Sequence, residues 1–305
     1  MPALYDLPAP AKLNLFLHIV GRRPDGYHLL ESVFALIDWH DTLHIETRAD
    51  ERIARHDLGE PLPADDLCLR AARLLRDAAQ HRGGCDIHID KRLPSGAGMG
   101  GGSSDAATVL LVLNKLWGLE WPLQRLADLA LQLGADVPFF IHGQTAWVTG
   151  VGEQITPLPE HPALREVLGV PVAVAKPPIV VPTAAIFGAP GLKRDTPHAI
   201  VADFLAAPRG FGRNDLQGPA EAYAPADRPD QAGQITQALA IMQNQYGNSR
   251  MTGSGSAVFS WVQPDATAAT PDSCPMPLAL PDAQWQGRVC RTLARHPLHA
   301  RLLSV

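Results

Sequence analysis

Several stretches in the first half of the chain alternate apolar and polar residues, a pattern that is typical of half-buried strands. In residues 12–20 (KLNLFLHIV), leucine or isoleucine occupies every second position from residue 13 to residue 19. We expect further strands at residues 33–37, 42–47, 85–93 and 147–151. Apolar residues that recur every three or four positions predict helices at residues 66–80, 104–117 and 122–133. The first half is therefore predicted to mix strands with helices.

The regular pattern weakens between residues 156 and 171, where the chain becomes rich in proline. We place a domain boundary near residue 155, so that residues 1–155 form one domain and residues 156–305 a second. In the second domain we expect strands at residues 170–175 and 257–262. We expect helices at residues 183–187, 197–205, 235–243 and 286–295. Residues 263–281 are rich in Pro, Ala, Thr and Asp, which predicts a flexible insertion.

A glycine-rich segment, PSGAGMGGGSSDAA at residues 94–107, lies between a predicted strand and a predicted helix. Glycine allows a positive φ and a close approach of the backbone to a ligand. The free N–H groups of a helix N-terminus bind anions, and Ser103, Ser104 and Asp105 are residue types that favour the N-cap or the first turn. The segment therefore predicts a loop that binds a polyphosphate.

Two common phosphate-binding motifs do not fit this loop. Gly96 and Gly101 have the spacing of a Walker A motif, but Gly102 stands where that motif needs lysine. Gly96, Gly98 and Gly101 match the dinucleotide fingerprint, which also requires an acidic residue at the end of a strand about 20 positions later. Glu120 lies at that distance but follows a predicted helix, which disfavours a dinucleotide site.

The composition narrows the class of protein. Of the 305 residues, 46% are hydrophobic and 19% are charged, as in folded globular chains. The 26 basic and 31 acidic residues give a net charge of −5, which disfavours a dedicated nucleic-acid binder. The four cysteines form no C-x-x-C pair, which favours free thiols in a reducing compartment. With no signal peptide and no apolar run of about 20 residues, we expect a cytoplasmic protein without a membrane or nucleic-acid partner.

Four motifs resemble the GHMP kinases and, among these, the branch that acts on 4-diphosphocytidyl-2-C-methyl-D-erythritol. They are PAKLNLFLHIVGRRPDGY (residues 10–27), the glycine-rich segment, GADVPFF (134–140) and MTGSGSAVF (251–259). The resemblance implies an α+β fold of two domains with the active site in the cleft between them. It also implies transfer of the ATP γ-phosphate to the 2-hydroxyl of that substrate, in the non-mevalonate route to isopentenyl diphosphate.

The resemblance assigns roles to individual residues. Asp136 is expected to be the general base and Lys12 to stabilise charge, with Asn14 at the hydroxyl-bearing end of the substrate. Taken alone, Lys12 is also typical of a solvated strand lysine and Asp136 of a helix N-cap. ATP is expected to bind the loop residues Pro94, Ser95, Gly96, Ala97, Gly98, Met99, Gly100, Gly101, Gly102, Ser103 and Ser104. Its Mg²⁺ is expected to be carried mainly by the phosphates, with no direct protein ligand assigned and with Ser104 and Asp105 as candidate outer contacts.

Two positions depart from the pattern of the family. Asp105 stands where some members have asparagine, and Asp66 stands where the family commonly has asparagine before a leucine. The second change disfavours the polar contact to adenine that the resemblance implies at this position.

Three aromatic residues are candidates for binding the cytidine group. Tyr27 and His28 lie at the end of the first motif, and Phe187 follows a Val-Pro-Thr segment that resembles the substrate side of the family. An aromatic face stacks on a nucleic-acid base of any sequence, so we expect Tyr27 and Phe187 to hold the base from opposite domains. The alternatives are a surface turn at Tyr27 and His28 and core packing of Phe187.

Two other functions remain open from the sequence. One is another GHMP kinase, of the homoserine or mevalonate type, and the other is a non-catalytic nucleotide-binding protein. The aromatic candidates favour the cytidine substrate over the first, and the presence of both Lys12 and Asp136 disfavours the second. We expect a small-molecule substrate and a monomer or weak homodimer.

Overall fold

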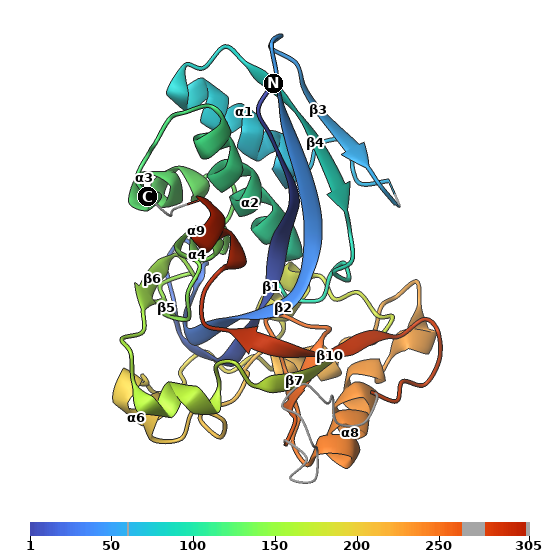
Figure 1. Ribbon diagram of the computed structural model, residues 1–305. Helices are drawn as coiled ribbons and strands as arrows, with labels where there is room; N and C mark the ends of the chain where they lie inside the picture. Colours follow the sequence, from blue (N-terminus) through green and yellow to red (C-terminus); the bar gives the residue numbers. More distant parts are fainter. Residues whose placement is uncertain (60, 264–277, 303–305) are drawn as a thin grey trace, which may run out of the picture.

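The computed structural model describes residues 1–59, 61–263 and 278–302. Two long antiparallel strands, β1 (Ala3–Arg22) and β2 (His28–Arg48), pair along most of their length and run side by side through the middle of the molecule (Figure 1). β1 begins nine residues before the predicted strand. Two separate strands were expected at residues 33–37 and 42–47. They are parts of the single strand β2, which continues through residues 38–41, and His40 and Asp41 pair there with β1.

β2 is the strand to which the two halves of the sheet attach. It pairs with β1 and with three further strands, β4, β5 and β10. The central order is β3-β4-β2-β10-β7-β9-β8, and β6 extends the sheet beyond β5. The bounds of these strands are β3 (Ile53–Asp57), β4 (Gly84–Asp90), β5 (Ala146–Thr149), β6 (Gln154–Pro157), β7 (Pro171–Lys176), β8 (Arg250–Met251), β9 (Val258–Trp261) and β10 (Gln286–Leu293).

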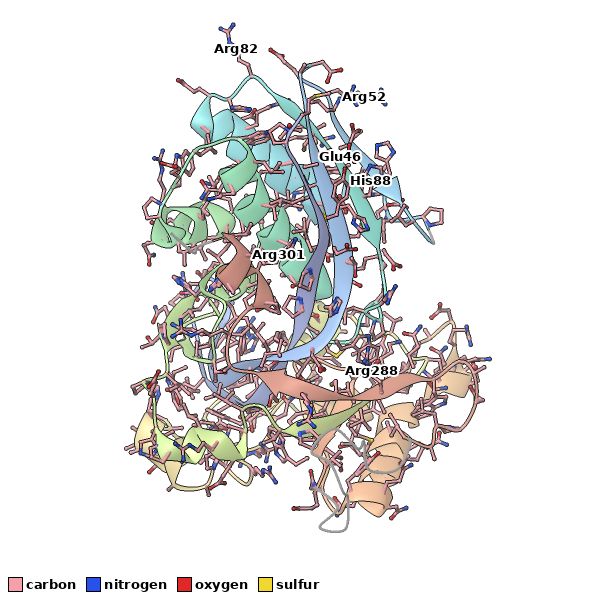
Figure 2. The ribbon with its side chains drawn as sticks, viewed as in Figure 1. Glu46, Arg52, Arg82, His88, Arg288 and Arg301 are labelled. Carbon is pink, nitrogen blue, oxygen red and sulfur yellow. The ribbon has the colours of Figure 1, made fainter. Side chains whose placement is uncertain are left out.

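Four helices of the first half lie on one side of β1 and β2 (Figure 1), namely α1 (Leu67–Ala79), α2 (Gly101–Leu116), α3 (Leu123–Ala130) and α4 (Val137–His142). Residues 104–113 of α2 are all buried, because this helix runs through the middle of the core. Successive side chains of a strand point to opposite faces of the sheet. Ile45 and Ile87 therefore pack in the core, whereas Glu46 and His88 lie on the outer face (Figure 2).

The second half adds short helices around β7 and β9, and the chain then returns to the first half. These helices are η1 (Pro162–Glu166), α5 (Thr183–Gly188), α6 (Val201–Ala206), α7 (Gln217–Glu221), η2 (Pro229–Gln231) and α8 (Gln234–Tyr246). The last helix, α9 (Pro297–Leu302), packs on the first half: the Arg301 guanidinium donates to the carbonyls of Asp6 and Tyr5 at 2.9 and 3.1 Å (Figure 2). None of the helices that the structure describes is long and apolar enough to span a membrane.

The helix predicted at residues 286–295 is wrong. These residues contain strand β10, whose residues 286–291 pair with β7. A Cβ at Gly287 would lie 2.6 Å from the Val174 carbonyl oxygen, which shows how closely the two strands approach. Cys290 and Thr292 are buried at alternate positions. Pairing with a strand more than 100 residues away overrides local helical propensity here.

Several other differences are smaller, and short elements such as β6, β8 and α7 were not predicted. Strand β3 was not predicted, because its sequence IARHD contains only two apolar residues and no alternation of them. The predicted domain boundary at residue 155 falls inside β6, which pairs with β5 of the first half. Residues 264–277, most of the predicted insertion, lie outside the described residues.

Candidate active site

The glycine-rich loop connects β4 to α2 and is fixed to β1 by its backbone. The Lys12 N–H donates to the Met99 carbonyl at 3.0 Å. α2 begins at Gly101, three residues before the predicted start, and its N-cap is Gly100 at φ +72°. Ser103 and Ser104 therefore lie in the first turn of the helix. The first N–H groups of a helix have no carbonyl partner within the helix and can bind an anion.

A second glycine turn, at residues 252–256, packs directly on the first loop. The N–H groups of Ser256 and Ala257 donate to the carbonyls of Gly96 and Ala97 at 3.3 and 3.2 Å. Gly98 has φ +70°, and a Cβ there would lie 2.6 Å from the Thr252 carbonyl oxygen. Glycine is therefore required at position 98 both by its backbone conformation and by the contact between the two turns.

Lys12 lies under this double turn in a buried polar cluster. Its ammonium donates to Asn14 Oδ1 at 2.6 Å and lies 3.6 Å from Asp136 Oδ2. Asn14 is held in turn by Ser32 Oγ, which accepts from its Nδ2 at 3.0 Å, and by Thr252 Oγ1, which accepts from its backbone N–H at 2.8 Å. Burial lowers the pKa of Lys12, and the charge of Asp136 offsets this only in part.

Asp136 occupies the N-cap position of α4, as the alternative interpretation predicted, but its side chain makes no capping hydrogen bond. Its carboxylate pairs with Lys12 instead, and about a third of the side chain is exposed. The structure thus brings together a buried cation and an accessible carboxylate from two motifs more than 120 residues apart. Such a pair can accept a proton from a hydroxyl and stabilise the alkoxide that forms.

A cavity of about 410 Å³ lies between the glycine-rich loop and the start of α1. Lys91 and Asp105 line it together with residues 93–102. Asp66 also lines it, but its carboxylate caps α1 by accepting the Leu69 N–H at 3.0 Å and pairs with Arg55 at 3.1 Å. Asp66 therefore has a structural role at the edge of this cavity.

The three aromatic candidates lie in different surroundings. The ring in contact with Phe187 is that of His28, with centroids 5.1 Å apart, whereas Tyr27 is 64% exposed. Arg194 Nε donates to His28 Nε2 at 3.0 Å, and its NH2 group donates to the Phe187 carbonyl at 3.1 Å. Burial and the nearby Arg194 charge lower the pKa of His28. No sequence pattern singled out Arg194.

This aromatic pair belongs to the same region as the two glycine turns. Thr183, the first residue of α5, forms a 2.9 Å hydroxyl contact with Ser254 of the second turn. Val180 lies 3.1 Å from the position that a Cβ of Gly96 would occupy. The segment that carries Phe187 is therefore anchored beside the loop that carries Gly96.

Comparisons with a family model and with known relatives all indicate the same kinase family. Residues 66–144 match the model of the GHMP kinase N-terminal domain. The chain is 56% identical to the 4-diphosphocytidyl-2-C-methyl-D-erythritol kinase of Methylibium petroleiphilum over 298 residues, which cover 98% of both chains. It is 51% identical to the enzyme of the same name from Variovorax paradoxus, again over 98% of both chains. The chain belongs to the 4-diphosphocytidyl-2-C-methyl-D-erythritol kinase family.

Solved structures agree with membership of this kinase family. A crystal structure of 4-(cytidine 5'-diphospho)-2C-methyl-D-erythritol kinase matches 94% of this chain and 99% of its own, with a TM-score of 0.70 and 33% identity. A mevalonate kinase matches with a TM-score of 0.65 at 12% identity over 97% of this chain, which shows the shared fold alone. The α+β GHMP kinase fold and the kinase activity class predicted from the sequence are confirmed.

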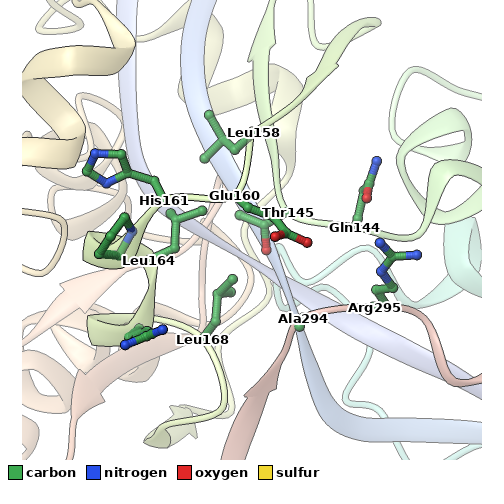
Figure 3. Close-up of a pocket in the computed structure, with 11 residues that line it drawn as sticks. Gln144, Thr145, Leu158, Glu160, His161, Leu164, Leu168, Ala294 and Arg295 are labelled. Carbon is green, nitrogen blue, oxygen red and sulfur yellow. The ribbon is translucent and has the colours of Figure 1, made fainter.

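A second cavity, of about 480 Å³, lies away from the residues predicted for this kinase family (Figure 3). It is formed by η1 and by the chain that follows β10, with Leu158 and Leu164 as an apolar wall. Its charged residues are Glu160, Arg165 and Arg295, of which Glu160 and Arg295 are labelled in Figure 3. None of the predicted catalytic, ATP-binding or substrate-binding residues lines this cavity.

Proposed function

We propose that this protein transfers the γ-phosphate of ATP to the 2-hydroxyl of 4-diphosphocytidyl-2-C-methyl-D-erythritol. The observation that carries the proposal is the Lys12–Asp136 pair, 3.6 Å apart, beside two interlocked glycine turns. Phosphoryl transfer depends mainly on positioning and on charge stabilisation. This pair supplies a base for the hydroxyl proton and a cation for the developing negative charge.

Each residue then has a distinct task. The Asp136 carboxylate accepts the proton of the 2-hydroxyl as its oxygen attacks the γ-phosphorus, and ADP leaves with the electrons of the broken P–O bond. The Lys12 ammonium stabilises the negative oxygen. We assign Asn14 to the hydroxyl-bearing end of the substrate, because its side chain is held by Ser32 in contact with Lys12.

The cytidine group is assigned to the aromatic region near α5. The ring of the buried His28 contacts the ring of Phe187. Tyr27, the residue before His28 in the sequence, is exposed. We propose that the base stacks on this aromatic surface. The contact of Arg194 with His28 and with the Phe187 carbonyl holds the two rings in place.

ATP is the co-substrate of this kinase family, and we assign its triphosphate to residues 94–104. Mg²⁺ is proposed to enter on the phosphates, where it neutralises their charge. The two carboxylates nearest the loop fit this arrangement, because Asp136 already faces Lys12 and Asp105 already faces Lys91. Phosphate oxygens are then the favoured ligands for a hard cation.

We keep three further expectations as proposals. The chain divides into two domains near residue 155, and the pairing of β6 with β5 attaches residues 154–157 to the first domain. The active site lies in the cleft between them. The protein acts in the cytoplasm as a monomer or a weak homodimer, in isoprenoid precursor synthesis.

The test is transfer of labelled phosphate from [γ-³²P]ATP to a panel of alcohols: the cytidine substrate, mevalonate and homoserine. We expect labelling of the cytidine substrate alone. Label on mevalonate or homoserine would instead indicate another GHMP kinase activity. No label on any alcohol, with ATP still bound in a titration, would indicate a non-catalytic nucleotide-binding protein.

A further inference from the structure

A second lysine lies against the glycine-rich loop, and it faces two buried carboxylates. The Lys91 ammonium donates to Asp105 Oδ2 at 2.6 Å and also to Asp41 Oδ2. Its Nζ lies 3.6 Å from the position that a Cβ of Gly101 would occupy, so it is directly beside the first residue of α2. The side chains of Asp41 and Asp105 are 0% and 4% exposed.

The two carboxylates are not equally satisfied. Asp41 Oδ1 accepts the N–H groups of Arg92 and Leu93 at 2.6 and 2.7 Å, and such charge-assisted bonds suit an ionised carboxylate. Asp105 Oδ1 is buried and has no hydrogen-bond partner among the described residues. Of the two, Asp105 is therefore the carboxyl group that the surroundings allow to be neutral.

The other groups around Asp105 do not balance its charge. Cys68 on α1 faces it, and burial together with the Asp105 charge raises the pKa of this thiol well above its usual value, so the thiol is neutral. Asp66 at the N-cap of α1 forms its own pair with Arg55 at 3.1 Å. With both aspartates ionised, the cluster beneath the loop has one positive and two negative charges.

A net negative cluster at this place opposes the binding of a polyphosphate. Lys91 and Asp105 both line the cavity beside the glycine-rich loop, and charges inside a protein are screened less than charges in water. One proton on Asp105 makes the cluster neutral and keeps Lys91 charged. Since the nucleotide is an anion, its arrival favours that protonated form.

We propose that Asp105 is a positioning residue for the nucleotide, and that its carboxylate takes up one proton from solvent when ATP binds. This inference rests on the proposed function, because it requires ATP in the cavity beside residues 94–104. Burial raises the pKa of Asp105, and Lys91 offsets this only in part, so that the value is about 8. The proton exchange therefore falls within the pH range in which the protein can be assayed.

The test is calorimetric titration with ATP and Mg²⁺, without the acceptor alcohol, at pH 7, 8 and 9. We expect the Kd for ATP to rise roughly three- to tenfold from pH 7 to pH 9, as ionised Asp105 must regain its proton. Asp105→Asn carries no ionisable group and should remove this rise. Asp90→Asn is the matched control, because its carboxylate pairs with the exposed Arg92 and should leave the rise as it is.

The same titration reports proton uptake directly when it is repeated in buffers of different ionisation enthalpy. We expect uptake of roughly half a proton per ATP at pH 8.5 in the unmodified protein, a readout that does not depend on the folding of any variant. No uptake at this pH, or an equal rise of Kd in Asp105→Asn, would overturn this inference alone. No ATP binding at any pH would overturn the proposed function as well.

Discussion

Lys12 and Lys91 both lie against the glycine-rich loop, yet their surroundings differ. Lys12 faces one carboxylate, Asp136, at 3.6 Å, and that carboxylate is about one-third exposed. Lys91 faces two carboxylates that are almost completely buried, and one of them also accepts two backbone N–H groups. The carboxylate of the first pair can reach a substrate, whereas the two carboxylates of the second cluster are buried beneath the loop.

The pKa of each lysine follows from this difference. Burial lowers the pKa of Lys12, because one partly solvated partner does not compensate for the loss of water. Burial also acts on Lys91, but the charges of Asp105 and Asp41 outweigh it and raise the pKa. Lys12 is thus suited to take part in chemistry, whereas Lys91, beside the same loop, is suited to keep a constant positive charge.

The largest effect is expected when the Lys12 pair is broken. Asp136→Asn should lower turnover by about 10²–10⁴, the usual contribution of a general base, and should leave ATP binding in place. The control is Asp128→Asn, a change of the same kind on α3, where the carboxylate contacts Gln124. The measurement is the steady-state turnover rate. A rate of Asp136→Asn within threefold of that of the unmodified enzyme would exclude Asp136 as the base.

Breaking the Lys91 cluster should instead lower stability. Asp41→Ala removes the acceptor of two backbone N–H groups, one buried and one partly buried, and one partner of Lys91. We therefore expect the free energy of unfolding to fall by about 3 kcal/mol. Asp90→Ala, which removes a carboxylate from an exposed pair, should cost less than about 1 kcal/mol. Urea unfolding measures both. Equal losses of unfolding free energy in the two variants would show that burial of the Lys91 cluster does not add to its contribution to stability.

The region of His28 and Phe187 belongs to neither lysine cluster and can be tested separately. Phe187→Ala should raise the KM for the cytidine substrate about tenfold or more, since stacking on a base contributes roughly 1–3 kcal/mol. The KM for ATP should stay nearly constant. If both KM values change together, or if the melting temperature falls sharply with KM unaltered, Phe187 is a packing residue.

How much of the site the sequence predicts depends on how local each feature is. The glycine-rich loop and the Lys12 and Asp136 positions were predicted, because each lies in a motif whose spacing is visible in the chain. The contact of Arg194 with His28 was not, because it joins residues 166 positions apart and neither belongs to a periodic pattern. The ring contact between His28 and Phe187 was not predicted for the same reason.

The fold shows the same division between local and distant causes. α1 was predicted to within one residue at each end, since its apolar spacing and the N-cap Asp66 are local signals. β10 was predicted as a helix, because its strand state depends on pairing with β7. The role of Asp41 was also missed, since its two N–H donors, Arg92 and Leu93, are brought to it only by the pairing of β2 with β4.

The smallest expected effect concerns the pH dependence of the Lys12 pair. Because the folded protein holds the pKa of Lys12 below its usual value of 10.5, the ammonium loses its proton as pH rises through that lowered value. Turnover requires the charged form, so kcat should begin to fall below pH 10.5. The decrease should approach tenfold per pH unit once the pH lies above that lowered value. Lys12→Arg keeps a positive charge at every pH and should lack this alkaline decrease, although its absolute rate is lower. The measurement is kcat at saturating concentrations of both substrates, so that the change in ATP affinity expected from Asp105 does not enter. A constant kcat up to pH 10.5, or the same decrease in Lys12→Arg, would show that the charge of Lys12 is not what the reaction uses.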